Sequence, residues 1–154
     1  MKIGEALNLL KKDKGKLARL ISLRKENLYV EEGKEKKFDP TKLSEEINKK
    51  VDEIRDLKIK IQNTNLNSSI QDKNISLAEA IIKVGDIRSK IASLSNLFEK
   101  DRFSYLYRDR EKIEKIPQLN EVEVEKEIAK LVSEKIILDN YIQMANWSLE
   151  LIQN

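Results

Sequence analysis

Six residues could form a binding site, because polar or aromatic side chains interrupt the helical apolar pattern at Asn63, Asn65, Asp86, Arg88, Asn146 and Trp147. A guanidinium donates paired hydrogen bonds to carboxylates and phosphates, so Arg88 with nearby amides could bind a small anion. The interpretation that we favour is structural, since buried polar side chains of this kind fix the register of packed helices. Trp147, the only tryptophan, would then fill a core or an interface.

Catalytic and metal chemistry is restricted by two missing residue types, since the 154 residues include no cysteine and no histidine. Without them the chain has no disulfide, no thiolate nucleophile, no imidazole base and no imidazole metal ligand. Carboxylate pairs such as Glu45 and Glu46 suggest a di-metal centre, but that architecture combines Glu with a Glu-x-x-His motif. We therefore predict a protein that is not an enzyme and uses no cofactor or metal.

A cationic run near the start could contact nucleic-acid phosphates; it comprises Lys11, Lys12, Lys14, Lys16 and Arg19. Of the 30 cationic residues 23 are lysine, and no aromatic residue lies within the run to stack on a base. Residues 1–30 carry a net charge of +5 (eight Lys/Arg against three Asp/Glu), whereas residues 121–154 carry −4 (three against seven). We favour pairing between the first and last helices, in one chain or between subunits, and keep nucleic-acid binding as the alternative.

Aliphatic residues recur at spacings of three and four along four stretches, which predicts amphipathic helices over 3–30, 40–66, 77–100 and 121–153. The first stripe contains Ile3, Leu7, Leu10, Leu17, Leu20, Ile21 and Leu28. The second and third include Leu43, Ile47, Val51, Ile54 and Leu77, Ile81, Val84, Ile87. The fourth stripe alternates four and three from Val124 to Ile152, with Lys135 as its one polar interruption, which is typical of coiled coils.

Capping signals support the starts of three of these helices. Asp39 precedes Pro40, an arrangement in which the carboxylate caps the helix and proline occupies its first turn. Ser76 with Glu79, and Asn120 with Glu123, have the spacing of capping boxes.

The segment 101–119 is the least helical part of the sequence. Phe103, Tyr105 and Tyr107 alternate with other residues, as in a short strand, and Pro117 would end a second arm. The segment is predicted to be either a β-hairpin arm or an irregular loop.

Together these features predict an all-α fold, an elongated antiparallel four-helix bundle in one domain over 1–154. A thin helical layer leaves apolar flanks at Val132, Ile136, Ile137 and Tyr141, which we interpret as self-association surface; the alternative is that they widen the core. No stretch reaches the roughly 18 apolar residues that a membrane-spanning helix needs, and the start lacks a signal peptide, so a cytoplasmic location is expected.

Four segments, in order along the chain, resemble a small family of uncharacterised bacterial proteins, some of which are labelled septicolysin. They are 1–7 (MKIGEAL), 61–65 (IQNTN), 77–86 (LAEAIIKVGD) and 145–147 (ANW). The resemblance implies an all-α fold and oligomers and carries no established activity. Pore formation, which the label suggests, is not expected, because the sequence has no apolar insertion segment.

The function expected from these features is that of a non-enzymatic, self-associating helical assembly protein that binds itself or another protein. Nucleic-acid association through the cationic run is the first alternative. Small-anion binding at Arg88 with the asparagines is the second.

Overall fold

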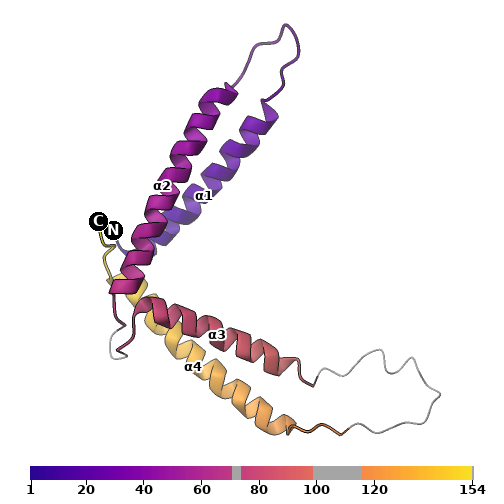
Figure 1. Cartoon of the computed structure of the whole chain (residues 1–154), viewed down its shortest axis with the longest axis vertical. Coiled ribbons are helices and arrows are strands. Elements are labelled where there is room, and N and C mark those ends of the chain that lie inside the picture. The colour runs from indigo at the N-terminus through magenta and orange to yellow at the C-terminus, as the bar shows by residue number, and fades with distance from the viewer. Residues whose placement is uncertain (71–73, 99–115, 154) are drawn as a thin grey trace, which may run out of the picture. The chain divides into compact units, whose positions relative to one another are not determined.

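The computed structural model describes residues 1–70, 74–98 and 116–153, which form four helices. These are α1 (Ile3–Glu26), α2 (Pro40–Asn67), α3 (Leu77–Ser95) and α4 (Glu121–Ser148). Helix α1 lies side by side with α2, and α3 with α4 (Figure 1). The all-α prediction of helices packed against each other is therefore confirmed.

The chain divides into two compact units, each of which is described by itself. The first unit is Met1–Ala78 with Gln143–Asn154, and the second unit is Glu79–Ile142. The single domain over 1–154 stays a prediction.

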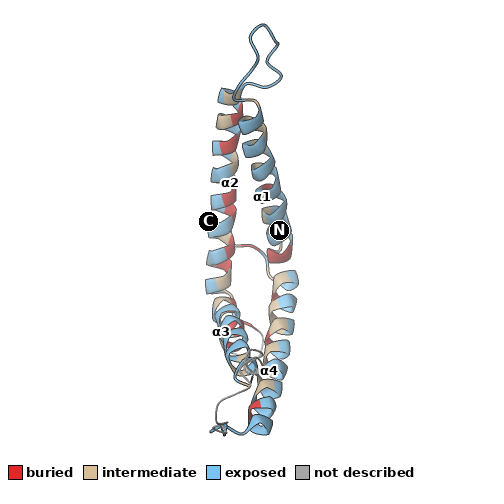
Figure 2. Cartoon of the chain, turned by 90° about the vertical axis from the view of Figure 1, so that its right-hand side faces the viewer, coloured by how far each residue is buried: buried red, intermediate tan, exposed pale blue. Residues whose placement is uncertain are grey.

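Helices α1 and α2 contact each other along one seam on each helix. The least exposed side chains of α2 recur strictly at spacings of four and three, at Leu43, Ile47, Lys50, Ile54, Leu57, Ile61 and Thr64. On α1 the corresponding set is Ile3, Ala6, Leu10, Asp13, Leu17 and Leu20. Figure 2 shows the buried stripe along α2. Spacings of three and four keep a seam on one side of a helix with 3.6 residues per turn.

Several large apolar residues that the sequence assigned to the buried stripes lie outside these seams. Leu7, Ile21, Leu28 and Val51 are exposed, as is Ile81 on α3. The seam runs instead through Ala6 on α1 and Ala80 on α3, both of them fully buried. At these two positions the prediction chose the larger neighbour, Leu7 or Ile81, whereas the phase of the helix selects the position that faces the other helix.

The helix starts agree with the capping signals. The Asp39 carboxylate accepts a hydrogen bond from the Thr41 amide (2.9 Å), and Asn120 Oδ1 accepts one from the Val122 amide (2.9 Å). Each side chain satisfies a backbone donor that has no partner within the helix.

The predicted helix ends were too late in three of four cases. Helix α1 ends at Glu26 rather than at 30. The amide and the side chain of the next residue, Asn27, both donate to the Leu23 carbonyl. Helix α3 ends at Ser95 rather than at 100, and a turn follows. Helix α4 ends at Ser148 rather than at 153, because the backbone after it pairs with the chain start. Helix α2 continues one residue beyond the predicted 66.

The second unit has a small core formed by Val84 and Ile87 of α3 with Leu138 of α4. Ile91, Leu131 and Ile142 pack against it, so the predicted α4 stripe is confirmed in this part. Lys135, its polar interruption, is half-buried, and its Nζ donates to Asp139 (2.8 Å).

Residues 99–115 lie outside the described part of the structure, and with them lies most of the segment 101–119 for which a hairpin or a loop was predicted. Residues 116–119 form neither helix nor strand. Within the described ranges, no helix has both the length and the hydropathy needed to cross a membrane.

Candidate functional site

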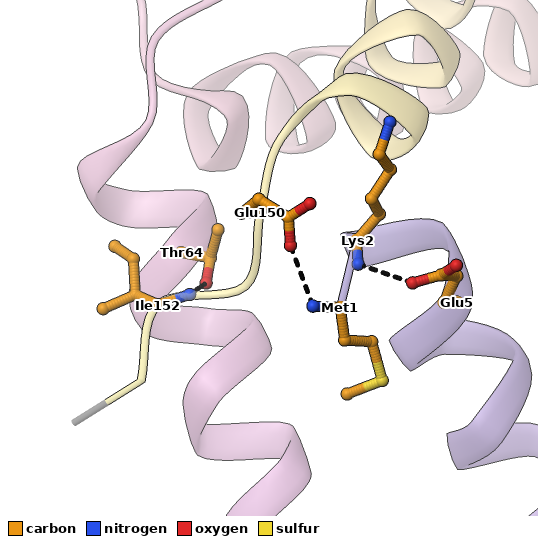
Figure 3. Close-up of polar contacts among 6 residues, drawn as sticks. All are labelled: Met1, Lys2, Glu5, Thr64, Glu150 and Ile152. Atoms are coloured by element: carbon orange, nitrogen blue, oxygen red, sulfur yellow. Dashed lines mark hydrogen bonds and ion pairs between the residues drawn. The ribbon is translucent and has the colours of Figure 1, made fainter.

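The chain start and the final residues meet near the C-terminal end of α2, beside the buried Thr64 (Figure 3). Thr64 is 0% exposed; its hydroxyl donates to the Lys60 carbonyl (2.7 Å) and accepts from the Ile152 amide (3.0 Å). The Ile3 amide donates to the Leu149 carbonyl, and the Leu151 amide donates to the Met1 carbonyl. This pairing joins residues that the sequence separates by most of the chain length, and we call it the terminal junction.

Charges at the rim of the terminal junction are paired at the surface. The Met1 amino group lies 2.8 Å from a Glu150 carboxylate oxygen. That hydrogen bond and the carboxylate charge raise the pKa of the amino group, and the amino group lowers the pKa of Glu150 in return. Both groups are exposed, so this pair contributes little to the fold compared with the buried Thr64 contacts.

Trp147 covers the first turn of α1. A β-carbon built on Gly4 would lie 2.9 Å from a carbon of the Trp147 ring, closer than van der Waals contact allows. The ring therefore packs directly on the Gly4 backbone, while about half of it, 52%, remains exposed. Trp147 therefore belongs to the packing of the terminal junction.

The six residues considered for a polar site divide between the two units. Asn63, Asn65, Asn146 and Trp147 belong to the first unit, and Asp86 and Arg88 belong to the second. The Asn63 carbonyl accepts from the Asn67 side chain (2.8 Å). Asn65 Oδ1 is buried and has no hydrogen-bond partner in the described part of the chain.

Arg88 of α3 pairs with a carboxylate of α4, as an ion pair to Asp139 at 3.7 Å. Lys83 of α3 forms a second ion pair, to Glu134 of α4, at 3.0 Å. Each pair joins α3 to α4. Lys83 and Arg88 are five residues apart, so the two pairs lie on different sides of the second unit.

An apolar surface accompanies the Arg88–Asp139 pair. Ile81 precedes Arg88 by seven residues, and Val132 and Ile136 precede Asp139 by seven and three, spacings that place them on the same side of their helices. All three aliphatic side chains are exposed. We call Ile81, Val132 and Ile136 the apolar flank.

The cationic run of the sequence lies on the exposed face of α1. Lys11, Lys12, Lys14, Lys16 and Arg19 are all exposed, and in the described ranges only Lys16 has an acidic partner, Asp13 at 3.8 Å. Lys12, Lys16 and Arg19 follow one another at spacings of four and three and so form one stripe.

Asp13 interrupts that run on the buried side of α1, and sequence reasoning missed its role. Its carboxylate is mostly buried and lies 3.5 Å from Lys50 Nζ of α2. Lys50 also donates to Glu53, and this hydrogen bond, followed by the Asp13 charge, raises the pKa of Lys50. The sequence does contain a signal for this pair. Asp13 and Lys50 are charged residues at positions where the spacing of each apolar stripe calls for an aliphatic residue.

An open groove lies between the end of α1 and the start of α2, where the connection 27–39 leaves the helices. Its volume is about 620 Å³, and its lining includes Ile21, Leu28, Pro40, Arg24, Lys25 and Ser44. The lining is mainly apolar, with Arg24 and Lys25 adding positive charge. We call this pocket the tip groove. Sequence reasoning missed it, because it depends on which turn of α1 faces the first turn of α2.

Within the described residues, no group of three or more acidic side chains is placed to hold a metal ion. The surface features that the geometry does present are the apolar flank, the cationic stripe and the tip groove.

Comparison with known proteins agrees with the fold. The crystal structure of a functionally unknown conserved protein from Corynebacterium diphtheriae is similar, with a TM-score of 0.83 at 24% sequence identity. The match covers 99% of this chain and 99% of that one, and at this identity it bears on the fold alone. No curated protein matches the sequence significantly. Residues 11–151 match a family of unknown function, DUF6847, and the chain belongs to that family.

Proposed function

We propose that the protein is a non-enzymatic, self-associating helical protein of the cytoplasm, and that its second unit forms the contact between copies. The observation that carries this proposal is the apolar flank: Ile81, Val132 and Ile136 stay exposed beside a small core.

Among its described residues, the second unit exposes more large aliphatic side chains than it buries. Val84, Ile87, Val124 and Leu138 are its buried ones. The exposed ones among its described residues include Ile81, Ile82, Val122, Val132, Ile136 and Ile137. Burying one such side chain fully stabilises a structure by about 1.5–3 kcal/mol, so a second copy that covers the flank would gain substantially. Large aliphatic side chains exposed on one side of a helix pair are candidates for an interaction site.

The proposed contact is a two-fold dimer in which the apolar flanks of two copies face each other. In such an interface every side chain is used twice, and the contact closes on itself. The Arg88–Asp139 pair beside the flank supplies charged groups for a polar rim.

Analytical ultracentrifugation of Ile136→Lys tests the proposal, with Ile59→Lys as the matched control. Ile136 is 52% exposed on α4, and Ile59 is 49% exposed on α2 in the first unit. We expect the wild type to associate at micromolar concentration, as a dimer or as a larger species that contains this contact. Ile136→Lys should weaken dimerisation at least about tenfold, the equivalent of 1.4 kcal/mol, while Ile59→Lys should not. A monomeric wild type, or equal effects of the two variants, would refute the proposal.

Nucleic-acid binding through the cationic stripe is the second candidate, favoured by the exposure of all five residues of the cationic run. It predicts retention on heparin and an affinity that falls steeply with salt. Reversing the charges of Lys12 and Lys16 to Glu should abolish retention, and the same reversal at Lys42 and Lys49 on α2 should not. No mobility shift of DNA or RNA at low salt would remove this candidate.

The resemblance to proteins labelled septicolysin stays a prediction beside this proposal. It adds oligomer formation, in agreement with the proposed dimer, and it adds no activity.

A further inference from the structure

The tip groove is an apolar surface with positive charge and no occupant. Ile21 of α1 and Leu28, which follows the end of that helix, both line the groove and are both exposed. Arg24 donates to Ser44 Oγ (3.2 Å), which uses one of its five donors. Neither Arg24 nor Lys25 has an acidic partner within the described residues, so the groove would accept an apolar segment that brings carboxylates.

The start of α4 has the complementary composition. Ile116, Leu119 and Val122 are exposed by 81%, 56% and 56%, and they recur every three residues. Between and after them lie Glu121, Glu123 and Glu125, all exposed, and residues 116–125 contain no cation. We call residues 116–125 the acidic segment.

We infer that the tip groove of one copy binds the acidic segment of a second copy. The exposed aliphatic side chains of the segment fill the apolar lining, and its carboxylates pair with Arg24 and Lys25. The inference rests on the proposed self-association and adds a second contact to it. Charge complementarity selects this occupant, because the cationic groove lining would repel the basic face of α1.

The two contacts differ in symmetry. The groove and the acidic segment are different surfaces, and the contact that we infer is the head-to-tail one, which continues from copy to copy in a ring or an open chain. The contact between apolar flanks closes after two copies. A protein with both contacts therefore forms species larger than a dimer, and removing either contact leaves a different residual assembly.

Light scattering coupled to size-exclusion chromatography on the full chain separates these species. Leu28→Asp and Val122→Asp, one on each side of the inferred contact, should each reduce the assembly to a dimer. Leu66→Asp is the control for Leu28, because Leu66 is 61% and Leu28 57% exposed in the same unit. Circular dichroism and thermal unfolding of each variant establish that the helices are retained.

Charge reversal tests the pairing itself. Lys25→Glu and Glu123→Lys should each weaken association beyond the dimer by about tenfold, and a chain with both reversals should recover it. Lys11→Glu, a reversal on the exposed face of the same helix, should have no effect.

The outcomes distinguish this inference from the proposed dimer. A wild type that stops at a dimer, or one whose large species survive Leu28→Asp, overturns the groove contact and leaves the flank contact standing. Loss of large species in Leu28→Asp but not in Val122→Asp overturns the acidic segment as the occupant. Large species that shrink in Leu28→Asp and persist unchanged in Ile136→Lys support the groove and refute the flank.

Discussion

At Gly4 the ring of Trp147 lies so close to the backbone that any side chain would collide with it, the nearest ring carbon being 2.9 Å from an added Cβ. An aromatic ring cannot bend away from an added atom, so the Trp147 ring or the α1 backbone would have to shift. Glycine is therefore required here by packing. By contrast, an added Cβ at Gly15, inside the same helix, would meet nothing within 4 Å.

The paired variants Gly4→Ala and Gly15→Ala should shift stability in opposite directions. Gly4→Ala should destabilise the protein by about 1–3 kcal/mol through overpacking. Gly15→Ala should stabilise it by about 0.5–1 kcal/mol, because alanine loses less backbone entropy in a helix. Urea unfolding measures both, and Trp147 fluorescence should change in Gly4→Ala alone. Equal shifts for the two variants would contradict the contact.

Thr64 shows how a polar residue can be the correct choice for a buried position. Its size suits the seam, and its hydroxyl satisfies the amide of Ile152, which a valine would leave unpaired. The sequence places Thr64 between two asparagines, and no local pattern indicates that its partner is 88 residues away.

At the scale of the elements, one polar pair sits inside the aliphatic seam between α1 and α2. Asp13 and Lys50 lie at the same level of the two helices, with the carboxylate oxygen 3.5 Å from the ammonium. Any slip of one helix along the other would separate the two charges and bury Asp13 against aliphatic side chains. We infer that the pair specifies the register of α1 against α2, the use best supported for buried polar groups.

Replacing the pair in steps tests this role. Lys50→Leu should lower the urea midpoint, since it leaves the Asp13 carboxylate with only the exposed Lys16 as a partner, whereas Lys49→Leu at the exposed neighbouring position should not. Adding Asp13→Leu to Lys50→Leu should restore or exceed the wild-type midpoint, because a well-packed aliphatic pair is often as stable as an ion pair. A double variant less stable than Lys50→Leu would show that the Asp13 carboxylate stabilises the fold through another partner.

Helix starts were predictable from local sequence, and helix ends were not. Asp39 and Asn120 cap amides two residues ahead of them, so the information for the start is contained in neighbouring residues. The end of α4 at Ser148 depends on Met1 and Ile3, which pair with the backbone that follows. Periodicity continued to Ile152, because Leu149 and Ile152 keep the helical spacing even though they lie beyond the helix.

At the scale of the whole molecule, the proposed association couples stability to concentration. A contact that exists only between folded copies stabilises the folded state by mass action. We therefore expect the midpoint of thermal unfolding to rise with protein concentration for the wild type. Ile136→Lys should abolish most of that dependence, and Ile59→Lys should retain it. Calorimetry over a hundredfold range of concentration gives the measurement, and a wild-type midpoint independent of concentration would contradict the proposed dimer.

Local sequence identified the exposed apolar residues of the candidate site and left the grouping of its polar residues open. The exposed apolar residues Ile136 and Ile137 were recognised from the α4 pattern. The stripe takes only every third or fourth residue, so these two isoleucines lie beside it. The grouping of Arg88 with Asn65 and Asn146 assumed a helix arrangement that the sequence does not contain. The structure assigns Arg88 to the other unit and gives it Asp139 as a partner.

The sequence by itself determined the four helices, their starts and the α4 seam, because caps and periodicity depend on residues less than two turns apart. It also determined that α1 is cationic on its exposed face. Only the tertiary structure decided which of two adjacent apolar residues enters a seam, as with Ala6 over Leu7 and Ala80 over Ile81. The same holds for the Asp13–Lys50 pair, the Thr64 contact to Ile152 and the tip groove. Each of these depends on the rotation and register of one helix against a distant segment, which packing fixes and local sequence leaves open.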